Sequence, residues 1–237
     1  MKHVLVTGAN GHVGGALVHL LAEQGYRVRA SVRNPGAEEK TRNLRDWGAE
    51  VVEADLMRPE TLTRALQGMD GLFQVAAVYA TVARDPQREI IDPSIIGGLN
   101  VLRAAHGAGV KKVVFTSSVA AVGSHAPPEQ PLTEADWNDR AVAPYFIAKT
   151  RAERSAWEFA QTQGLKLVVI NPCAVIGPGF YRHTPSTQYL EELLRGRLPM
   201  VLPLGFSFVD VRDVARVRLA ACRTMPPTRC MKSPAMP

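Results

Sequence analysis

Short apolar runs rich in β-branched residues alternate along the chain with longer segments in which apolar positions recur every three or four residues. The short runs predict strands, and the longer segments predict amphipathic helices. This alternation is typical of a parallel sheet with helices on both faces, so we predict an α/β fold with a Rossmann-type doubly wound parallel sheet. The strands are expected at 4–6, 27–32, 50–54, 72–76, 112–116 and 165–170. The helices are expected at 12–24, in a short segment ending at 43–47, from Pro59 onward, at 94–108 and at 145–163.

The regular pattern weakens after Asn171, where prolines and glycines interrupt the chain. We expect residues 1–171 to form the Rossmann domain and residues 172–223 to form a small, incomplete substrate lobe. Within the lobe, helices are expected at 188–195 and 211–221, and an extended segment at 207–209. Residues 224–237 hold four prolines and show little periodicity, which predicts an irregular tail.

Composition narrows the class of protein. Of the 237 residues, 46% are hydrophobic and 21% are charged, as in ordinary globular domains. No stretch approaches the roughly 18 apolar residues of a membrane span, and the N-terminus does not resemble a signal peptide, so we expect a cytoplasmic protein. The three cysteines lack metal-binding spacing, and we expect no metal. The net charge is +6, but basic and acidic residues are interleaved, so we expect an anionic cofactor rather than nucleic acid.

Three glycines lie between the first strand and the first helix, at the spacing G-x-x-G-x-x-G. Glycines allow a tight turn and a close approach of the backbone to a pyrophosphate, and the helix N-terminus attracts that anion. A glycine-rich turn without a ligand is the alternative, but the flanking strand and helix favour a dinucleotide site. The candidate cofactor-binding residues here are Gly8, Asn10, Gly11, His12, Val13 and Gly14.

The end of the second predicted strand carries Arg33, where NAD-binding versions of the motif carry an acidic residue. A guanidinium binds a 2′-phosphate through charge-assisted hydrogen bonds, so the sequence favours NADP(H). Lys40 is a candidate for a second contact, with a solvated surface lysine as the alternative. Asp55, after the third strand, is a candidate acceptor for the adenine amino group, and a helix N-cap or turn aspartate is the other interpretation.

Tyr145 and Lys149 stand four residues apart in a predicted helix, and therefore on one face of it. Transfer of a hydride to a carbonyl needs a proton donor at the oxygen, and a nearby cation makes a tyrosine a better donor because it stabilises the phenolate. An amphipathic helix with an interfacial tyrosine is the alternative. Ser118 ends the strand before this helix, where parallel sheets place ligands. Ser117 is a competing candidate, because consecutive strand residues point in opposite directions.

These features together resemble the extended short-chain dehydrogenases/reductases of the NAD-dependent epimerase/dehydratase superfamily. The resemblance rests on the glycine motif, Asp55-Leu56, Thr116-Ser117-Ser118, the Tyr-x-x-x-Lys pair and Asn171-Pro172-Cys173-Ala174-Val175-Ile176-Gly177-Pro178. It covers roughly residues 2 to 220 in order. Within this group the chain is most similar to the dihydroflavonol-4-reductase-like branch, which includes bacterial members associated with hopanoid and sterol metabolism.

The resemblance implies that Ser118, Tyr145 and Lys149 form a catalytic triad, with Tyr145 as the general acid in reduction. It implies a substrate cleft lined by 78–85, 119–126 and 180–187. Asn100 is expected to be a structural helix residue, and neither His12 nor His125 is expected to be a catalyst. Further cofactor contacts implied by the resemblance are Leu56, Ala76, Ala77, Val78, Thr116, Pro172 and Val175.

Extended members usually continue well beyond a segment similar to 208–215, whereas this chain ends soon after it. We therefore expect a truncated substrate lobe, and a truncated or frame-shifted reading frame is one hypothesis for it. The favoured function is reduction of a ketone or aldehyde on a small or polycyclic hydrophobic substrate, or oxidation of the alcohol. The alternatives are a hydroxysteroid dehydrogenase, a sugar-nucleotide epimerase, and a non-catalytic NADP(H)-sensing regulatory protein. Relatives commonly dimerise through helices flanking the tyrosine, so a homodimer is a candidate assembly.

Overall fold

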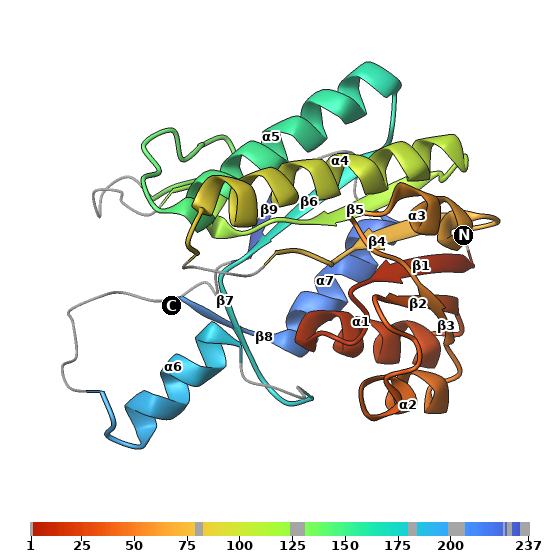
Figure 1. Cartoon of the computed structure of the whole chain (residues 1–237), viewed down its shortest axis with the longest axis horizontal. Coiled ribbons are helices and arrows are strands. Elements are labelled where there is room, and N and C mark those ends of the chain that lie inside the picture. The colour runs from red at the N-terminus through yellow and green to blue at the C-terminus, as the bar shows by residue number, and fades with distance from the viewer. Residues whose placement is uncertain are drawn as a thin grey trace.

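The computed structural model describes residues 2–78, 83–123, 131–179, 184–198, 207–224, 226 and 229–232. A parallel sheet with the strand order β3-β2-β1-β4-β5-β6-β9 forms the centre of the molecule (Figure 1). Chain order reverses direction between β1 and β4, and such a switch point is where open α/β sheets bind ligands. The strands are β1 His3–Thr7, β2 Arg27–Val32, β3 Glu50–Glu53, β4 Gly71–Gln74, β5 Lys112–Thr116, β6 Leu167–Pro172 and β9 Arg229–Lys232.

Helices cover both faces of this sheet and bury two separate apolar layers. One layer joins α1, α2 and α7 to side chains such as Val6, Val114 and Ile170, and the other joins α3, α4 and α5 to Leu5 and Val113 on the opposite face. Because successive strand residues point to opposite faces, neighbours such as Val113 and Val114 serve different layers. The helices are α1 His12–Glu23, α2 Glu38–Asp46, α3 Pro59–Leu66, α4 Asp92–Gly107, α5 Pro144–Gln163, α6 Pro185–Leu194 and α7 Val211–Arg223.

The predicted Rossmann-type doubly wound fold is confirmed, and most element boundaries agree within two or three residues. Two short helical segments were not predicted. A π-helix at Gln87–Ile91 leads into α4, and a 3₁₀-helix at Val119–Ala121 follows β5. No helix in the described ranges is long and apolar enough to cross a membrane.

The C-terminal part differs from the prediction in two ways. We predicted an irregular tail from 224 onward, but Arg229–Lys232 forms β9, which pairs in parallel with β6 at the edge of the main sheet. We also assigned all of 172–223 to a substrate lobe, whereas α7 packs against α1, β5 and β6 and so belongs to the core of the sheet domain. Outside that core lie α6 and a second, two-stranded sheet of β7 Ala174–Ile176 and β8 Phe208–Asp210.

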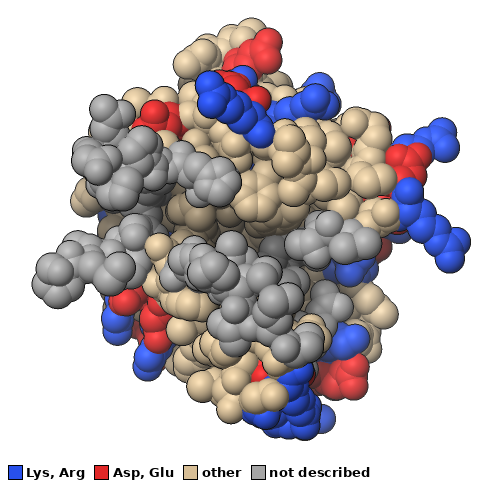
Figure 2. Space-filling model, turned by 90° about the vertical axis from the view of Figure 1, so that its left-hand side faces the viewer, with Lys and Arg blue, Asp and Glu red and all other residues tan. Residues whose placement is uncertain are grey.

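Figure 2 shows the face towards which the carboxyl ends of the main strands run. Lysine and arginine side chains lie beside aspartate and glutamate around the margin of this face, and the described surface towards its middle is largely uncharged. This is the side of the molecule that carries the candidate active site.

Candidate active site

The glycine loop is built tightly against the end of β4. Thr7 is buried at the end of β1, and its hydroxyl accepts hydrogen bonds from the backbone N–H groups of Val75 (2.9 Å) and Ala76 (3.0 Å). Gly8 follows with φ at +62°, and a Cβ there would lie 2.9 Å from the Cα of Ala76. A side chain at this position is therefore excluded both by backbone conformation and by space.

The N-terminus of α1 faces the turn that these glycines form. Gly11 is the N-cap, no side chain caps this helix end, and the first turn holds no acidic residue. The helix therefore directs backbone donors and the positive end of its dipole at an anion. A Cβ at Gly14 would lie 2.2 Å from the carbonyl oxygen of Gly8, so α1 can pack this closely against the glycine loop only if position 14 carries no side chain. These residues fit the pyrophosphate of a dinucleotide.

His12, the first residue of α1, joins the glycine loop to the loop after β7. Its side chain is buried, and its Nε2 atom lies 3.1 Å from the carbonyl oxygen of Pro178. Burial lowers the pKa of this imidazole, and its contacts with the backbone at Gly177 and Pro178 oppose that change. His12 is therefore a buried link between these two loops. His125 lies outside the described residues.

The candidate contacts for the 2′-phosphate lie beyond the end of β2. Arg33 directly follows that strand and is exposed, and the backbone N–H of Ala9 donates to the carbonyl of Ser31 (3.1 Å), which keeps the strand end beside the glycine loop. Lys40 lies on α2, is exposed and forms an ion pair with Glu39 (3.4 Å). Both cations are accessible to an anionic group.

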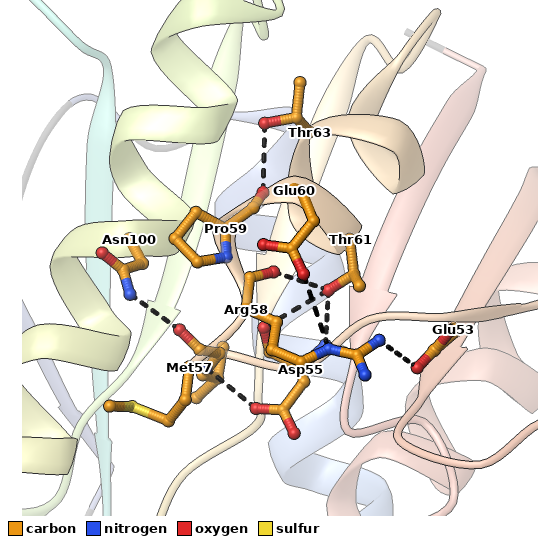
Figure 3. A network of polar contacts seen from close by, with 10 residues as sticks. Glu53, Asp55, Met57, Arg58, Pro59, Glu60, Thr61, Thr63 and Asn100 are labelled. Carbon is orange, nitrogen blue, oxygen red and sulfur yellow. Dashed lines mark hydrogen bonds and ion pairs between the residues drawn. The ribbon is translucent and has the colours of Figure 1, made fainter.

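Asp55 lies in a hydrogen-bonded turn between β3 and α3 (Figure 3), and Leu56 follows it. The Asp55 carboxylate accepts a hydrogen bond from the N–H of Met57 (2.8 Å), and the Asp55 N–H donates to the Thr61 hydroxyl (2.9 Å). The Asn100 side chain on α4 donates to the carbonyl of Leu56 (2.9 Å). The interpretation of Asp55 as a turn residue is confirmed, although the N-cap of α3 is Arg58. Asn100 has the structural role expected of it.

Tyr145 and Lys149 lie one turn apart at the start of α5, where Pro144 takes the first helical position. A hydrogen bond joins the side chains of Tyr145 and Ser118. The Lys149 Nζ atom lies 5.7 Å from the centre of the Tyr145 ring. The sequence-predicted trio is thus brought together at the carboxyl end of β5.

Ser118, rather than Ser117, faces Tyr145. Ser118 caps the 3₁₀-helix, with its Oγ accepting from the N–H of Ala120 (3.2 Å). Ser117 continues the strand: its N–H donates to the carbonyl of Ile170 (2.9 Å), and its buried hydroxyl has no hydrogen-bond partner among the described residues. The geometry therefore resolves the competition between these serines in favour of Ser118 as the neighbour of the tyrosine.

Burial perturbs both titratable members of the trio. It raises the pKa of the Tyr145 hydroxyl, and the hydrogen bond from Ser118 opposes that rise. It lowers the pKa of Lys149 to about 8, with the nearby Glu153 carboxylate opposing the change and Arg218 adding to it. Two groups with perturbed pKa values in contact at a sheet edge are typical of a site of acid–base chemistry.

A narrow pocket opens beside this trio between α4 and α5. It brings together six of the sequence-predicted cofactor and catalytic residues, including Lys149 and Thr116. Pro172 ends β6, and Val175 packs with Val13 in a separate apolar cluster that joins β7 to α1. The predicted cleft segments lie partly outside the described residues, at 79–82, 124–126 and 180–183. The pocket is lined by Leu56, Gln74, Ala76, Ala77, Val78, Ser94, Gly98, Phe115, Thr116, Ser117, Lys149 and Ala152.

Three buried polar residues behind the trio were missed by the sequence analysis as parts of the site. Glu153, Asn171 and Arg218 are all fully buried. The spacing of Glu153, four residues after Lys149, is a signal that could have placed it on the same helix face. For Arg218 no comparable signal exists, because an arginine at one position of an amphipathic helix ordinarily lies at the surface.

Comparison with known proteins gives a consistent family. The family model described as "NAD dependent epimerase/dehydratase family" matches residues 4–229. Cinnamoyl-CoA reductase 1 of Petunia hybrida is 37% identical over 93% of this chain and 69% of its own length. Dihydroflavonol 4-reductase of Arabidopsis thaliana is 38% identical over 74% of this chain, which corresponds to 50% of that protein.

A solved structure agrees with these sequence relatives. The yeast methylglyoxal/isovaleraldehyde reductase Gre2, complexed with NADPH, superposes with a TM-score of 0.84 at 26% identity, over 98% of this chain and 78% of that one. The resemblance therefore extends through the whole described sheet.

Proposed function

The chain belongs to the NAD dependent epimerase/dehydratase family, the extended short-chain dehydrogenases/reductases, and from this membership we propose that it is an NADP(H)-dependent oxidoreductase that reduces a ketone or aldehyde. The observation that carries the proposal is the contact of Tyr145 with Ser118, with the Lys149 ammonium beside the same ring. The relatives named as cinnamoyl-CoA and dihydroflavonol reductases, and the NADPH complex of a similar reductase, support it.

Each member of the trio has a distinct task in this proposal. A bound nicotinamide cofactor supplies the hydride to the carbonyl carbon. Tyr145 donates its phenolic proton to the carbonyl oxygen, and Ser118 donates a hydrogen bond to the same oxygen. Lys149 stabilises the resulting phenolate by its positive charge, which lowers the free energy of proton donation from a partly buried tyrosine. In the oxidative direction the same phenolate accepts the proton of the alcohol.

The cofactor is proposed to be NADP(H) rather than NAD(H). If the pyrophosphate binds at the N-terminus of α1, the adenosine ribose of the cofactor points towards the end of β2, where Arg33 can bind a 2′-phosphate. Arg33 itself directly follows β2, in place of the acidic residue that would repel this phosphate. Lys40 offers a second cation on α2. The turn at Asp55 and Leu56 borders the adenine side, and Pro172 and Val175 border the nicotinamide side.

The substrate is proposed to be a small hydrophobic carbonyl compound that binds between the trio and the smaller sheet. The described part of the smaller sheet packs on α1 and α7 through apolar side chains, with Cys173, Val209 and Val214 in one buried cluster. A lobe built from β7, β8 and α6 would cover the substrate. The pattern of apolar surface with a few convergent polar groups is typical of small-molecule sites.

Turnover of defined carbonyl compounds tests the proposal. Purified full-length chain is mixed with NADPH and, in turn, isovaleraldehyde, methylglyoxal, a dihydroflavonol and a cinnamoyl thioester, and NADPH oxidation is followed by absorbance. Wild-type turnover should fall by roughly 10²- to 10⁴-fold in Tyr145→Phe, with NADPH affinity kept. Turnover unchanged by that substitution would overturn the mechanism. Binding of NADPH without turnover of any probe would favour a sensing protein.

A further inference from the structure

Three buried charged side chains lie in or behind the candidate active site, and the proposed reaction uses only one of them, Lys149. Lys149 and Glu153 come from α5, and Arg218 comes from α7 on the opposite face of the sheet. Glu153 and Arg218 are 0% exposed and Lys149 is 9% exposed. Removing three charges from water is strongly unfavourable unless they interact with one another or with polar groups. Their arrangement therefore calls for a functional explanation.

Glu153 continues the face of α5 that carries the trio. It stands four residues after Lys149 and eight after Tyr145, so the three side chains follow one another along one side of the helix. The negative charge of the Glu153 carboxylate acts on the Lys149 ammonium electrostatically and favours its charged form. In a buried site such an influence is only weakly screened by solvent.

Asn171 connects Glu153 to the backbone of Ser118. The Asn171 Nδ2 atom, at the end of β6, donates to the Glu153 Oε2 atom (2.7 Å) and to the carbonyl oxygen of Ser118 (3.0 Å). The carboxylate thus fixes the orientation of an amide that in turn holds the main chain of the serine facing Tyr145. A buried, charge-assisted hydrogen bond of this kind restrains its partners strongly.

Arg218 approaches the end of β5 from the opposite face of the sheet, on α7. Its Nε and Nη2 atoms donate to the Thr116 hydroxyl (3.2 and 3.0 Å), and its Nη1 atom donates to the carbonyl of Val214 (3.4 Å). Burial lowers the pKa of Arg218 to about 9, and no carboxylate of the described residues opposes that change. The guanidinium stays charged at neutral pH, so it repels the Lys149 ammonium across the end of the sheet.

We propose that Glu153 is a positioning residue for the site, whose buried carboxylate holds the Lys149 ammonium in its charged form and, through Asn171, fixes the Ser118 main chain. The inference rests on the proposed reductase function for its catalytic meaning. The electrostatics agree with it: burial lowers the pKa of Lys149, Glu153 raises it, and Arg218 lowers it. Tyr145, on the same helix, is the remaining titratable group of the cluster, and burial raises its pKa.

The direct test measures the pKa of Lys149 in the folded, full-length protein without any substrate. The chain is labelled with [ε-¹³C]lysine, the Lys149 signal is assigned by its loss in Lys149→Arg, and its chemical shift is followed against pH by NMR. Glu153→Gln keeps the shape and an acceptor oxygen but removes the charge, so the Lys149 pKa should fall by roughly one to three pH units. Glu153→Asp keeps the charge and should stay much closer to wild type.

Two further variants bracket this result. Glu158→Gln removes a carboxylate from an exposed position of the same helix and should leave the Lys149 pKa unchanged. Arg218→Met removes the repelling cation and should raise the pKa. If Glu153→Gln alone does not fold, as judged by circular dichroism, the comparison of Arg218→Met with Arg218→Met/Glu153→Gln replaces it, because the double variant does not leave two buried cations together without a carboxylate.

Activity separates failure of this inference from failure of the proposed function. With isovaleraldehyde as the probe, the high-pH limb of kcat/KM should move to lower pH in Glu153→Gln and stay in place in Glu153→Asp. A rate that is lowered equally at every pH, with the Lys149 pKa unmoved, would mean a merely structural role and would overturn the inference. A displaced Lys149 pKa in a protein that reduces no carbonyl probe would support the positioning role and count against the reductase function.

Discussion

The carbonyl oxygen of Gly8 lies 2.2 Å from the point that a Cβ on Gly14 would occupy. Replacement of Gly14 by alanine therefore forces α1 away from the glycine loop, and overpacking of this kind destabilises a fold by about 1–3 kcal/mol. We expect Gly14→Ala to lower NADPH affinity at least about tenfold, because the helix N-terminus leaves the pyrophosphate position. Fluorescence titration with NADPH and thermal unfolding measure the two effects.

Gly15 provides the matched control for that substitution. A Cβ there would lie 3.6 Å from the carbonyl oxygen of Ala9, an ordinary van der Waals contact, and the residue lies within α1. Gly15→Ala should keep NADPH affinity and gain up to about 1 kcal/mol of stability from helix propensity. Equal losses of affinity in Gly14→Ala and Gly15→Ala would contradict the steric argument.

Arg33 should decide between the two nicotinamide cofactors. A charge-assisted hydrogen bond contributes about 1.5–3 kcal/mol, so Arg33→Ser should weaken NADPH binding by roughly 10- to 100-fold and leave NADH binding nearly unchanged. Separate titrations with NADPH and NADH measure the difference. Arg42→Ser, an exposed cation on α2, controls for loss of general positive charge. A similar loss of affinity for both cofactors in Arg33→Ser would remove the specificity role assigned to this residue.

Replacement of Asn100 should weaken the binding of NADPH and of NADH to a similar extent. Asn100→Ala removes the side chain that donates a hydrogen bond to the Leu56 carbonyl and frees the turn at Asp55; Figure 3 shows Asn100 and Asp55. Loss of a partner for a partly buried carbonyl costs about 1–3 kcal/mol, and we expect similar weakening of NADPH and NADH binding because the adenine side is common to both. The same titrations, with thermal unfolding alongside, test this. Selective loss of NADPH affinity alone would show that the turn contacts the 2′-phosphate instead.

The ionised Asp70 carboxylate should stabilise the fold near neutral pH and lose part of that contribution in acid. Its carboxylate accepts hydrogen bonds from the N–H groups of Lys2 (2.9 Å) and His3 (3.2 Å) and from Lys111 (3.2 Å), and the backbone bonds are the main reason that its pKa lies far below the usual range. A carboxyl with a depressed folded-state pKa contributes stability above its unfolded pKa of about 4 that is lost as pH falls below it. Asp70→Asn should therefore lower Tm at pH near 7 more than at pH near 3, measured by calorimetry. An equal change at both pH values would contradict this assignment.

The main sheet was predictable because its strands are encoded locally. Runs such as the one at β5 are apolar and β-branched enough to specify a buried strand, and the flanking helices carry clear apolar stripes. The glycine motif was predictable for the same reason, since only bare backbone fits the positions of Gly8 and Gly14. Local chemistry and tertiary structure agree throughout this part of the chain.

The C-terminal elements and the buried charges depend on tertiary context instead. Arg229–Lys232 has no β-branched residue, and it forms β9 because β6 offers an open parallel edge beside it. Glu153 and Arg218 look like surface residues of amphipathic helices until α5 and α7 are placed on opposite faces of one sheet end. Propensity and periodicity report on a single element at a time, so they could not identify a cluster that two helices form together.

Ser118 and Ser117 offer the sharpest test of the trio because they are adjacent in sequence and face different groups. Ser118 contacts Tyr145, whereas the Ser117 hydroxyl is buried without a partner among the described residues. Ser118→Ala should lower kcat for a carbonyl probe at least about tenfold, since it removes a donor to the developing charge on the oxygen. Ser117→Ala should cost less activity and change the free energy of unfolding little, because loss of an unpaired buried hydroxyl is nearly neutral. Steady-state kinetics and thermal unfolding of both variants decide the matter, and a greater loss of kcat in Ser117→Ala would transfer the proposed catalytic role to that serine.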